Sequence, residues 1–101
     1  MPKPTIFHVL ILNNGRINPP DNRKTLSLSA GDEVRWIAAG GGPFTIFFPN
    51  NPFTGNNFPV SVGTPGQSGP AVKGVPGQAY KYQVLDAARA ILDDPDVLIE
   101  G

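Results

Sequence analysis

The stretch that decides the fold is residues 23–39, Arg-Lys-Thr-Leu-Ser-Leu-Ser-Ala-Gly-Asp-Glu-Val-Arg-Trp-Ile-Ala-Ala. Apolar side chains occupy every second position on both sides of Gly31-Asp32, and Trp36 belongs to the second of these series. A period of two is the pattern of a half-buried strand, and a Gly-Asp pair is typical of a tight turn. The stretch therefore predicts two strands, residues 23–29 and 33–39.

The same signals recur outward in both directions along the chain. Further strands are expected at residues 5–12, 44–48, 59–62, 71–73, 78–86 and 97–100. The first of these is apolar enough to predict a strand with both faces largely covered. Residues 87–92 are too short for an independent helix, so we expect a hairpin connection there. Short strands separated by Gly and Pro predict an all-β sandwich or small barrel.

The composition favours one ordered, loop-rich domain over residues 1–101. Gly and Pro number 12 each, and 16 of these 24 residues lie between positions 40 and 77. Residues 36–72 carry no charge at all. Nine aromatic residues argue against disorder, because disordered chains are poor in aromatics. The absence of Cys excludes disulfides, thiolate metal sites and cysteine nucleophiles.

The charge balance limits the partners that we expect. Eight basic and eight acidic side chains leave no electrostatic footprint for nucleic acid or an anionic membrane. No apolar run approaches the ~18 residues of a membrane span, so no membrane insertion is expected. The remaining candidates are an unknown protein partner or self-association. The sequence as written predicts a cytoplasmic protein, or a periplasmic or secreted one if a signal peptide has been removed.

Four motifs in order carry a resemblance to a known family. They are Gly31-Asp32-Glu33-Val34-Arg35-Trp36, Pro43-Phe44-Thr45-Ile46, Gly77-Gln78-Ala79-Tyr80-Lys81-Tyr82-Gln83-Val84 and Val97-Leu98-Ile99-Glu100. This order resembles the cupredoxin family, which consists of blue-copper-type β-sandwiches. The resemblance implies a Greek-key sandwich of seven to eight strands.

The copper ligands of that family are missing from this sequence. The family binds copper through two His, one Cys and a weak axial Met. The first His position aligns with Phe44 and the Cys position with Val84, while the second His falls around Ala87 and the Met around Leu92. All four are apolar, and copper selects imidazole and thiolate ligands. We therefore expect a filled pocket with no metal and no other cofactor.

Phe47, Phe53 and Phe58 form the candidate contact surface. Phe47 alternates out of phase with its apolar neighbours, and the other two lie in an Asn- and Pro-rich loop. Long loops in compact domains are often functional, and uncharged aromatic loops resemble protein or carbohydrate contact surfaces. The alternative is that these rings fold back and close the end of the sandwich.

Three other features have ordinary structural explanations. His8 is the single histidine, and a strand position at a sheet edge or surface is favoured over a proton switch. Gly40-Gly41-Gly42 lacks a following Lys-Ser/Thr pair, so a link or bulge is favoured over a phosphate loop. The acidic cluster near the C-terminus lacks the Gly and Glu of a calcium loop, so a turn is favoured over a cation site. It consists of Asp86, Asp93, Asp94 and Asp96.

No arrangement of residues indicates catalysis, so the expected protein is not an enzyme. The leading hypothesis is a metal-free cupredoxin-like domain of unknown specificity that acts as a non-catalytic binding or protein-interaction module. The alternative is a degenerate copper-handling or electron-transfer protein. A small enzyme is the third possibility, for which no nucleophile and base can be named.

Overall fold

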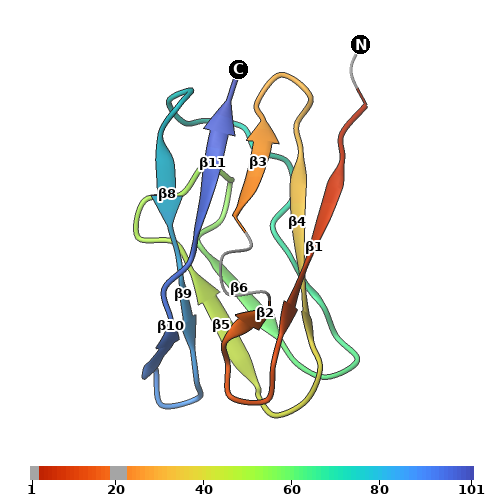
Figure 1. Cartoon of the computed structure of the whole chain (residues 1–101), viewed down its shortest axis with the longest axis vertical. Coiled ribbons are helices and arrows are strands. Elements are labelled where there is room, and N and C mark those ends of the chain that lie inside the picture. The colour runs from red at the N-terminus through yellow and green to blue at the C-terminus, as the bar shows by residue number, and fades with distance from the viewer. Residues whose placement is uncertain (1–2, 19–22) are drawn as a thin grey trace.

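The computed structural model describes residues 3–18 and 23–101, and every regular element in that part of the chain is a β-strand (Figure 1). The molecule is elongated, with extents of 38 × 23 × 23 Å. Pro19-Pro20-Asp21-Asn22, whose residue types predict a turn or loop, lies outside the described residues. The strands are β1 (Ile6–Ile11), β2 (Ile17–Asn18), β3 (Lys24–Ser27), β4 (Glu33–Ala38), β5 (Phe44–Phe47), β6 (Asn57–Val60), β7 (Gly66–Gln67), β8 (Ala79–Lys81), β9 (Gln83–Leu85), β10 (Ile91–Asp93) and β11 (Asp96–Glu100).

The strands form three sheets that enclose one core. The first sheet has the order β2-β1-β4-β7, the second β10-β9-β5-β6 and the third β3-β11-β8. The second and third sheets are continuous, because only Tyr82 separates β8 from β9 and only Asp94-Pro95 separates β10 from β11. The Tyr82 N–H donates to the Pro95 carbonyl at 2.9 Å. The segment β8–β9 and the segment β10–β11 therefore stay hydrogen-bonded to each other where both pass between the two sheets. The all-β arrangement is consistent with a β-sandwich.

Two strand pairs are parallel although most of the pairing is antiparallel. β1 runs parallel to β4 from Ile6 opposite Glu33 to Ile11 opposite Ala38. β11 runs parallel to β3 over four residue pairs. Parallel neighbours cannot be joined by a tight hairpin, so the chain leaves the sheet and returns between them.

The alternation at residues 33–39 predicted β4 correctly. Val34, Trp36 and Ala38 are buried, whereas Ile37 between them is exposed. For β1 the prediction of two covered faces is wrong, since Ile6 is 41% exposed. The first sheet contributes one side to the core and leaves the other uncovered, as antiparallel and mixed sheets of sandwiches commonly do.

Three other strand predictions need correction. Residues 71–73 form a loop rather than an edge strand. Their N–H groups donate to the carbonyls of Asp32 and Pro52 and not to successive residues of one neighbouring strand. The strand expected at 59–62 lies at Asn57–Val60. The strand expected at 78–86 is divided at Tyr82, where the chain passes from the third sheet to the second. The division at Tyr82, together with the additional strands β2, β7 and β10, explains why the described residues contain eleven strands rather than seven or eight.

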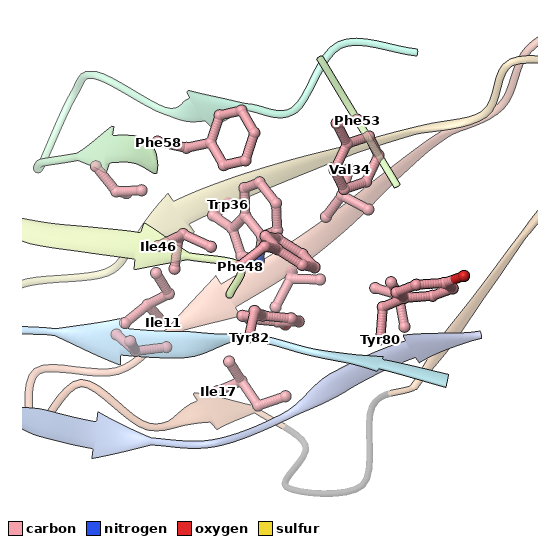
Figure 2. Close-up of a cluster of buried hydrophobic side chains, with 14 of the residues drawn as sticks. Ile11, Ile17, Val34, Trp36, Ile46, Phe48, Phe53, Phe58, Tyr80 and Tyr82 are labelled. Atoms are coloured by element: carbon pink, nitrogen blue, oxygen red, sulfur yellow. The ribbon is translucent and has the colours of Figure 1, made fainter. Parts of the chain in front are cut away.

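Aromatic side chains form the centre of the core (Figure 2). Trp36 is fully buried and lies 5.5 Å from the rings of both Phe58 and Tyr82, measured between centroids. Phe48 lies 4.9 Å from Tyr82 and 5.4 Å from Phe53. Ring pairs at these separations contribute about 0.5–1.5 kcal/mol beyond the burial of their area. Burial raises the pKa of Tyr82, because ionisation would place a charge inside this core.

Asp32 fixes the end of the molecule at which β3 turns into β4. Its side chain is buried, and its two carboxylate oxygens accept the N–H groups of Thr5 and Ser27, each at 2.8 Å. Its carbonyl oxygen accepts the N–H of Ala71 at 2.9 Å. A buried carboxylate is tolerated when backbone donors satisfy it. Asp32 therefore ties the start of β1, the end of β3 and the loop after β7 together.

Candidate functional site

Three chain connections meet at the lower end of the molecule in Figure 1. This end lies opposite the turn that joins β3 to β4. The three connections are the β1–β2 turn, the β4–β5 link and the β9–β10 turn. Between them lies an open cavity of about 450 Å³, which we call the end hollow. It is lined by Asn13, Asn14, Gly42, Pro43, Phe44, Asp86, Ala87, Ala88 and Leu92.

Close packing holds two walls of the end hollow in place. At Gly40 a Cβ atom would collide with Oδ1 of Asn13, and at Gly41 it would come within 2.6 Å of the Asn13 carbonyl oxygen. Gly41 also has a φ of +66°, a conformation that L side chains rarely adopt. The glycines thus allow the β4–β5 link to press directly against the β1–β2 turn.

Side-chain capping holds the turns themselves. In the β9–β10 turn, Oδ1 of Asp86 accepts the N–H groups of Ala88 and Ala90, both at 2.9 Å. In the β1–β2 turn, Oδ1 of Asn14 accepts the Arg16 N–H at 3.0 Å. Asp and Asn favour such turns because their short side chains reach the backbone two residues on. One oxygen of each capping side chain is therefore committed to the fold.

Three of the four positions that align with the copper ligands of cupredoxins lie at this end of the molecule. Phe44, Ala87 and Leu92 line the end hollow, and Val84 is fully buried in β9. None of these side chains has an atom that can bind a metal. The polar groups of the lining are amides and one carboxylate, which are hard oxygen donors and do not match copper. The residues present do not fit the copper of that family.

The hypothesis of a contact surface at Phe47, Phe53 and Phe58 is wrong for two of the three rings. Phe53 is fully buried and Phe58 is 8% exposed, so both belong to the core. The alternative, in which the rings fold inward, applies to them, because a Phe ring gains about 1.5–3 kcal/mol on leaving water. Phe47 is half-buried, and the guanidinium carbon of Arg89 lies 5.9 Å from the centre of its ring.

His8 and the glycine run occupy the positions expected from their structural explanations. His8 is exposed on the outer side of β1, where the parallel register places it beside Arg35. It does not line the end hollow. Gly40-Gly41-Gly42 connects β4 to β5, and the element that follows the run is a strand.

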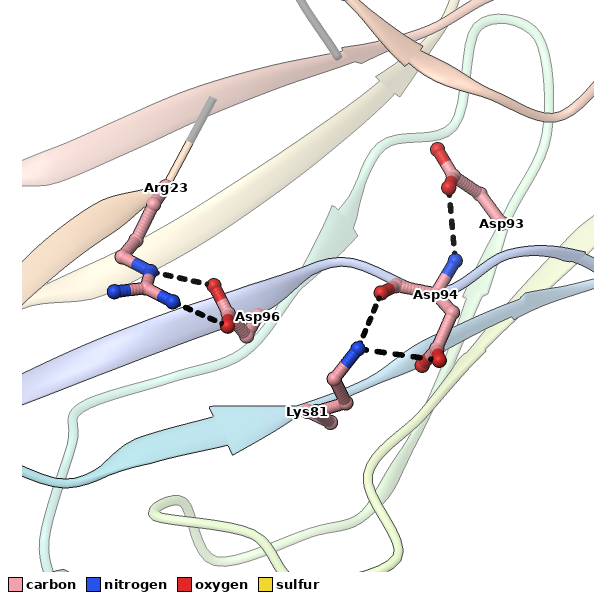
Figure 3. A network of polar contacts seen from close by, with 5 residues as sticks. All are labelled: Arg23, Lys81, Asp93, Asp94 and Asp96. Atoms are coloured by element: carbon pink, nitrogen blue, oxygen red, sulfur yellow. Dashed lines mark hydrogen bonds and ion pairs between the residues drawn. The ribbon is translucent and has the colours of Figure 1, made fainter. Parts of the chain in front are cut away.

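The acidic cluster is divided among separate backbone and ion-pair contacts (Figure 3). Asp96 forms two hydrogen bonds with Arg23, both at 2.7 Å, and these contacts raise the pKa of Arg23. Asp94 pairs with Lys81 at 3.2 Å. The Asp93 carboxylate accepts the N–H groups of Ile17 and Asp94. These bonds match the turn interpretation rather than a cation site.

Within residues 3–18 and 23–101, no three His, Cys, Asp or Glu side chains come close enough together to hold a metal ion. The same part of the chain contains no helix long and apolar enough to cross a membrane.

Comparison of the chain with protein-family models, with curated proteins and with solved structures found no match in any of the three. The functional interpretation therefore depends on the geometry of the chain itself.

Sequence reasoning did not identify the polar residues of the end hollow as a group. The residue types of Asn13-Asn14-Gly15 predict only a turn, and Asp86 was assigned to the acidic cluster. Asn13 and Asn14 lie in the β1–β2 turn, whereas Asp86 lies in the β9–β10 turn more than 70 positions later, and the fold brings them to one cavity. The available signal was that each belongs to a turn, which is too common a feature to mark a site.

Proposed function

We propose that this chain is a cupredoxin-like Greek-key β-sandwich without a copper site, and that it serves as a non-catalytic binding or interaction module. The end hollow is its contact site. The observation that carries the proposal is that three of the four positions aligned with copper ligands line one open cavity, yet bear Phe, Ala and Leu.

Three features support this proposal. The four sequence motifs occur in the order of the family. The chain leaves the first sheet after β2, adds β3 to the third sheet and returns to the first with β4, and Greek-key sandwiches likewise connect strands of different sheets. The end hollow is built from chain connections, and binding residues concentrate on connections that a rigid scaffold positions.

Copper titration tests the metal-free part of the proposal. Isothermal titration calorimetry of the full chain with Cu(II), and with Cu(I) under anaerobic conditions, is expected to show no stoichiometric binding at submicromolar strength. The ligand inventory is the reason, since the chain has no Cys and one His, which lies on the outer side of β1. Tight one-to-one binding would instead favour a degenerate copper-handling or electron-transfer protein.

A fragment screen tests whether the end hollow is the contact site. Small neutral, cationic and anionic fragments are added to ¹⁵N-labelled protein, and amide chemical shifts are followed. We expect the shifted amides to cluster around Asn14, Gly42 and Ala87, because concave sites with a few polar groups capture small molecules best. Shifts that cluster on another surface, or none at all, would contradict the proposal.

A further inference from the structure

We propose that the end hollow binds a neutral sugar residue through neighbouring hydroxyl groups. This inference rests on the proposed function and specifies the ligand class of the same site. Its starting point is the set of hydrogen-bonding groups that the fold leaves free there. Oδ1 of Asp86 is occupied by two backbone N–H groups, whereas Oδ2 accepts no hydrogen bond within the described part of the chain.

Asn14 adds a donor to this free acceptor. Its Oδ1 accepts the Arg16 N–H, which leaves the Nδ2 amino group to donate. Asn13 also belongs to the lining, and both its Oδ1 and its Nδ2 lie beside Gly40. The lining residues thus offer a carboxylate acceptor and one amide donor group.

This combination discriminates among ligand charges. The negative charge of Asp86 would repel an anion, and the lining contains no Lys, Arg or His that could offset this repulsion. A purely cationic group would satisfy Asp86 but has no acceptor for the amide N–H groups. A hydroxyl group donates and accepts at once, so two adjacent hydroxyls satisfy both kinds of group.

The remaining walls suit the carbon face of a sugar ring. Pro43, Ala87 and Leu92 are apolar, and two of the nine lining residues are alanines, which leave room for a ring. A volume of about 450 Å³ lies within the usual range of ligand sites, about 300–1,000 Å³. An extended peptide would instead require an open strand edge or a long groove. The end hollow is bounded by three turns of chain.

The site is also preformed, which lowers the cost of ordering it on binding. The glycine link is pressed against Asn13, and the capping bonds of Asp86 and Asn14 hold their turns without a ligand. Preorganised polar groups lose less conformational freedom when a ligand binds. Even so, a small neutral ligand in an open cavity is expected to bind with a Kd of about 1 mM.

The experiment uses the full chain and four groups of probe compounds. Glucose, galactose, mannose and N-acetylglucosamine represent neutral sugars, butylammonium a cation, propionate an anion and N-acetylalanine N-methylamide the peptide backbone. Binding is measured by ¹⁵N NMR titration. We expect at least one sugar to give saturable shifts of the amides of Asn13, Asn14, Gly42, Ala87 and Ala88.

Two isosteric substitutions test the role of the free polar groups. Asp86→Asn and Asn14→Asp each retain the capping oxygen and change only the group that we assign to the ligand. For a sugar, each is expected to weaken binding about tenfold, the effect of one charge-assisted hydrogen bond. For a cation, Asn14→Asp would strengthen binding while Asp86→Asn weakened it. Asn50→Asp, an exposed position outside the end hollow, is the matched control and should leave the Kd unchanged.

The outcomes separate the inference from the proposed function. Saturable sugar binding that both isosteric variants weaken supports the inference. Binding of only the cation, the anion or the peptide mimic at this site overturns the sugar assignment and leaves the contact site standing. Failure of every probe to shift these amides overturns both. A well-dispersed spectrum of each variant shows that it is folded, so a loss of binding cannot be assigned to unfolding.

Discussion

The two ends of this molecule use an aspartate in opposite ways. Asp32 is buried, and both of its carboxylate oxygens accept backbone N–H groups. Asp86 is half-buried, and within the described part of the chain its carboxylate accepts backbone N–H groups only through Oδ1. The first carboxylate is fully used by the fold, whereas the second retains an acceptor at an open cavity. The number of oxygens left free, rather than the residue type, therefore separates a structural from a candidate binding carboxylate.

The packing around the two ends differs in the same way. The Asp32 end is joined through Ala71 to the loop that carries Phe53, since Val72 and Lys73 both donate to the Pro52 carbonyl. That loop places Phe53 in the core. The opposite end has turns that are individually capped and leave the end hollow between them.

The largest expected effect is on the loop at the Asp32 end. Phe53→Ala should lower the free energy of unfolding by about 4 kcal/mol, because a fully buried ring is replaced by a cavity. Phe47→Ala is the matched control and should cost only about 1 kcal/mol, because that ring is half-buried. Urea denaturation followed by Trp36 fluorescence measures both. Equal losses would mean that the loop is not part of the core.

The next effect concerns the carboxylate that ties that end together. Asp32→Ala should cost about 3 kcal/mol in urea denaturation, because it leaves two backbone N–H groups without an acceptor. Asp94→Ala removes an exposed pair with Lys81 and should cost less than about 1 kcal/mol. If the two variants were equally stable, Asp32 would not be the fixed point of this end.

A third prediction examines how firmly the wall of the end hollow is packed. Gly15 has a φ of +84°, and a Cβ there would collide with Leu92, which lines the hollow. Gly63 has a φ of +80° with nothing within 4 Å of its Cβ position. Gly15→Ala should therefore cost about 3 kcal/mol and Gly63→Ala about 1 kcal/mol, the cost of the backbone conformation alone. Thermal denaturation of the pair measures the difference, and similar losses would indicate a loosely packed wall.

The smallest effect is a loss of folding stability at alkaline pH, and it originates in the core between the two ends. Burial raises the pKa of Tyr82 above its unfolded value of about 10, so the folded state holds this proton more tightly than the unfolded state. The associated stability is fully present below about pH 10 and decreases as the pH rises further. Wild type should lose about 1.4 kcal/mol per pH unit relative to Tyr82→Phe above pH 10. Parallel curves from urea denaturation between about pH 8 and 11 would contradict the assignment.

Features of the chain that depend on local pattern could be predicted from the residues alone. The alternation around Trp36 predicted β4, the Gly31-Asp32 pair predicted the turn before it, and the apolar run at residues 5–12 predicted β1. The sequence also determined that the chain has no thiolate to offer a metal, because this follows from composition alone. Strand periodicity and turn chemistry act over a few residues, so they can be recognised without knowing the fold.

Which residues share a site depends on tertiary packing, which local pattern does not predict. Phe58 turns inward against Trp36 and Phe53 turns inward against Phe48, and no local pattern predicts these contacts. β2 and β7 are strands of two residues each, and they exist because neighbouring strands lie beside them. The end hollow combines three connections that are distant in the sequence. Such groupings arise from long-range packing, and only the folded chain brings Asn13, Asn14 and Asp86 around one cavity.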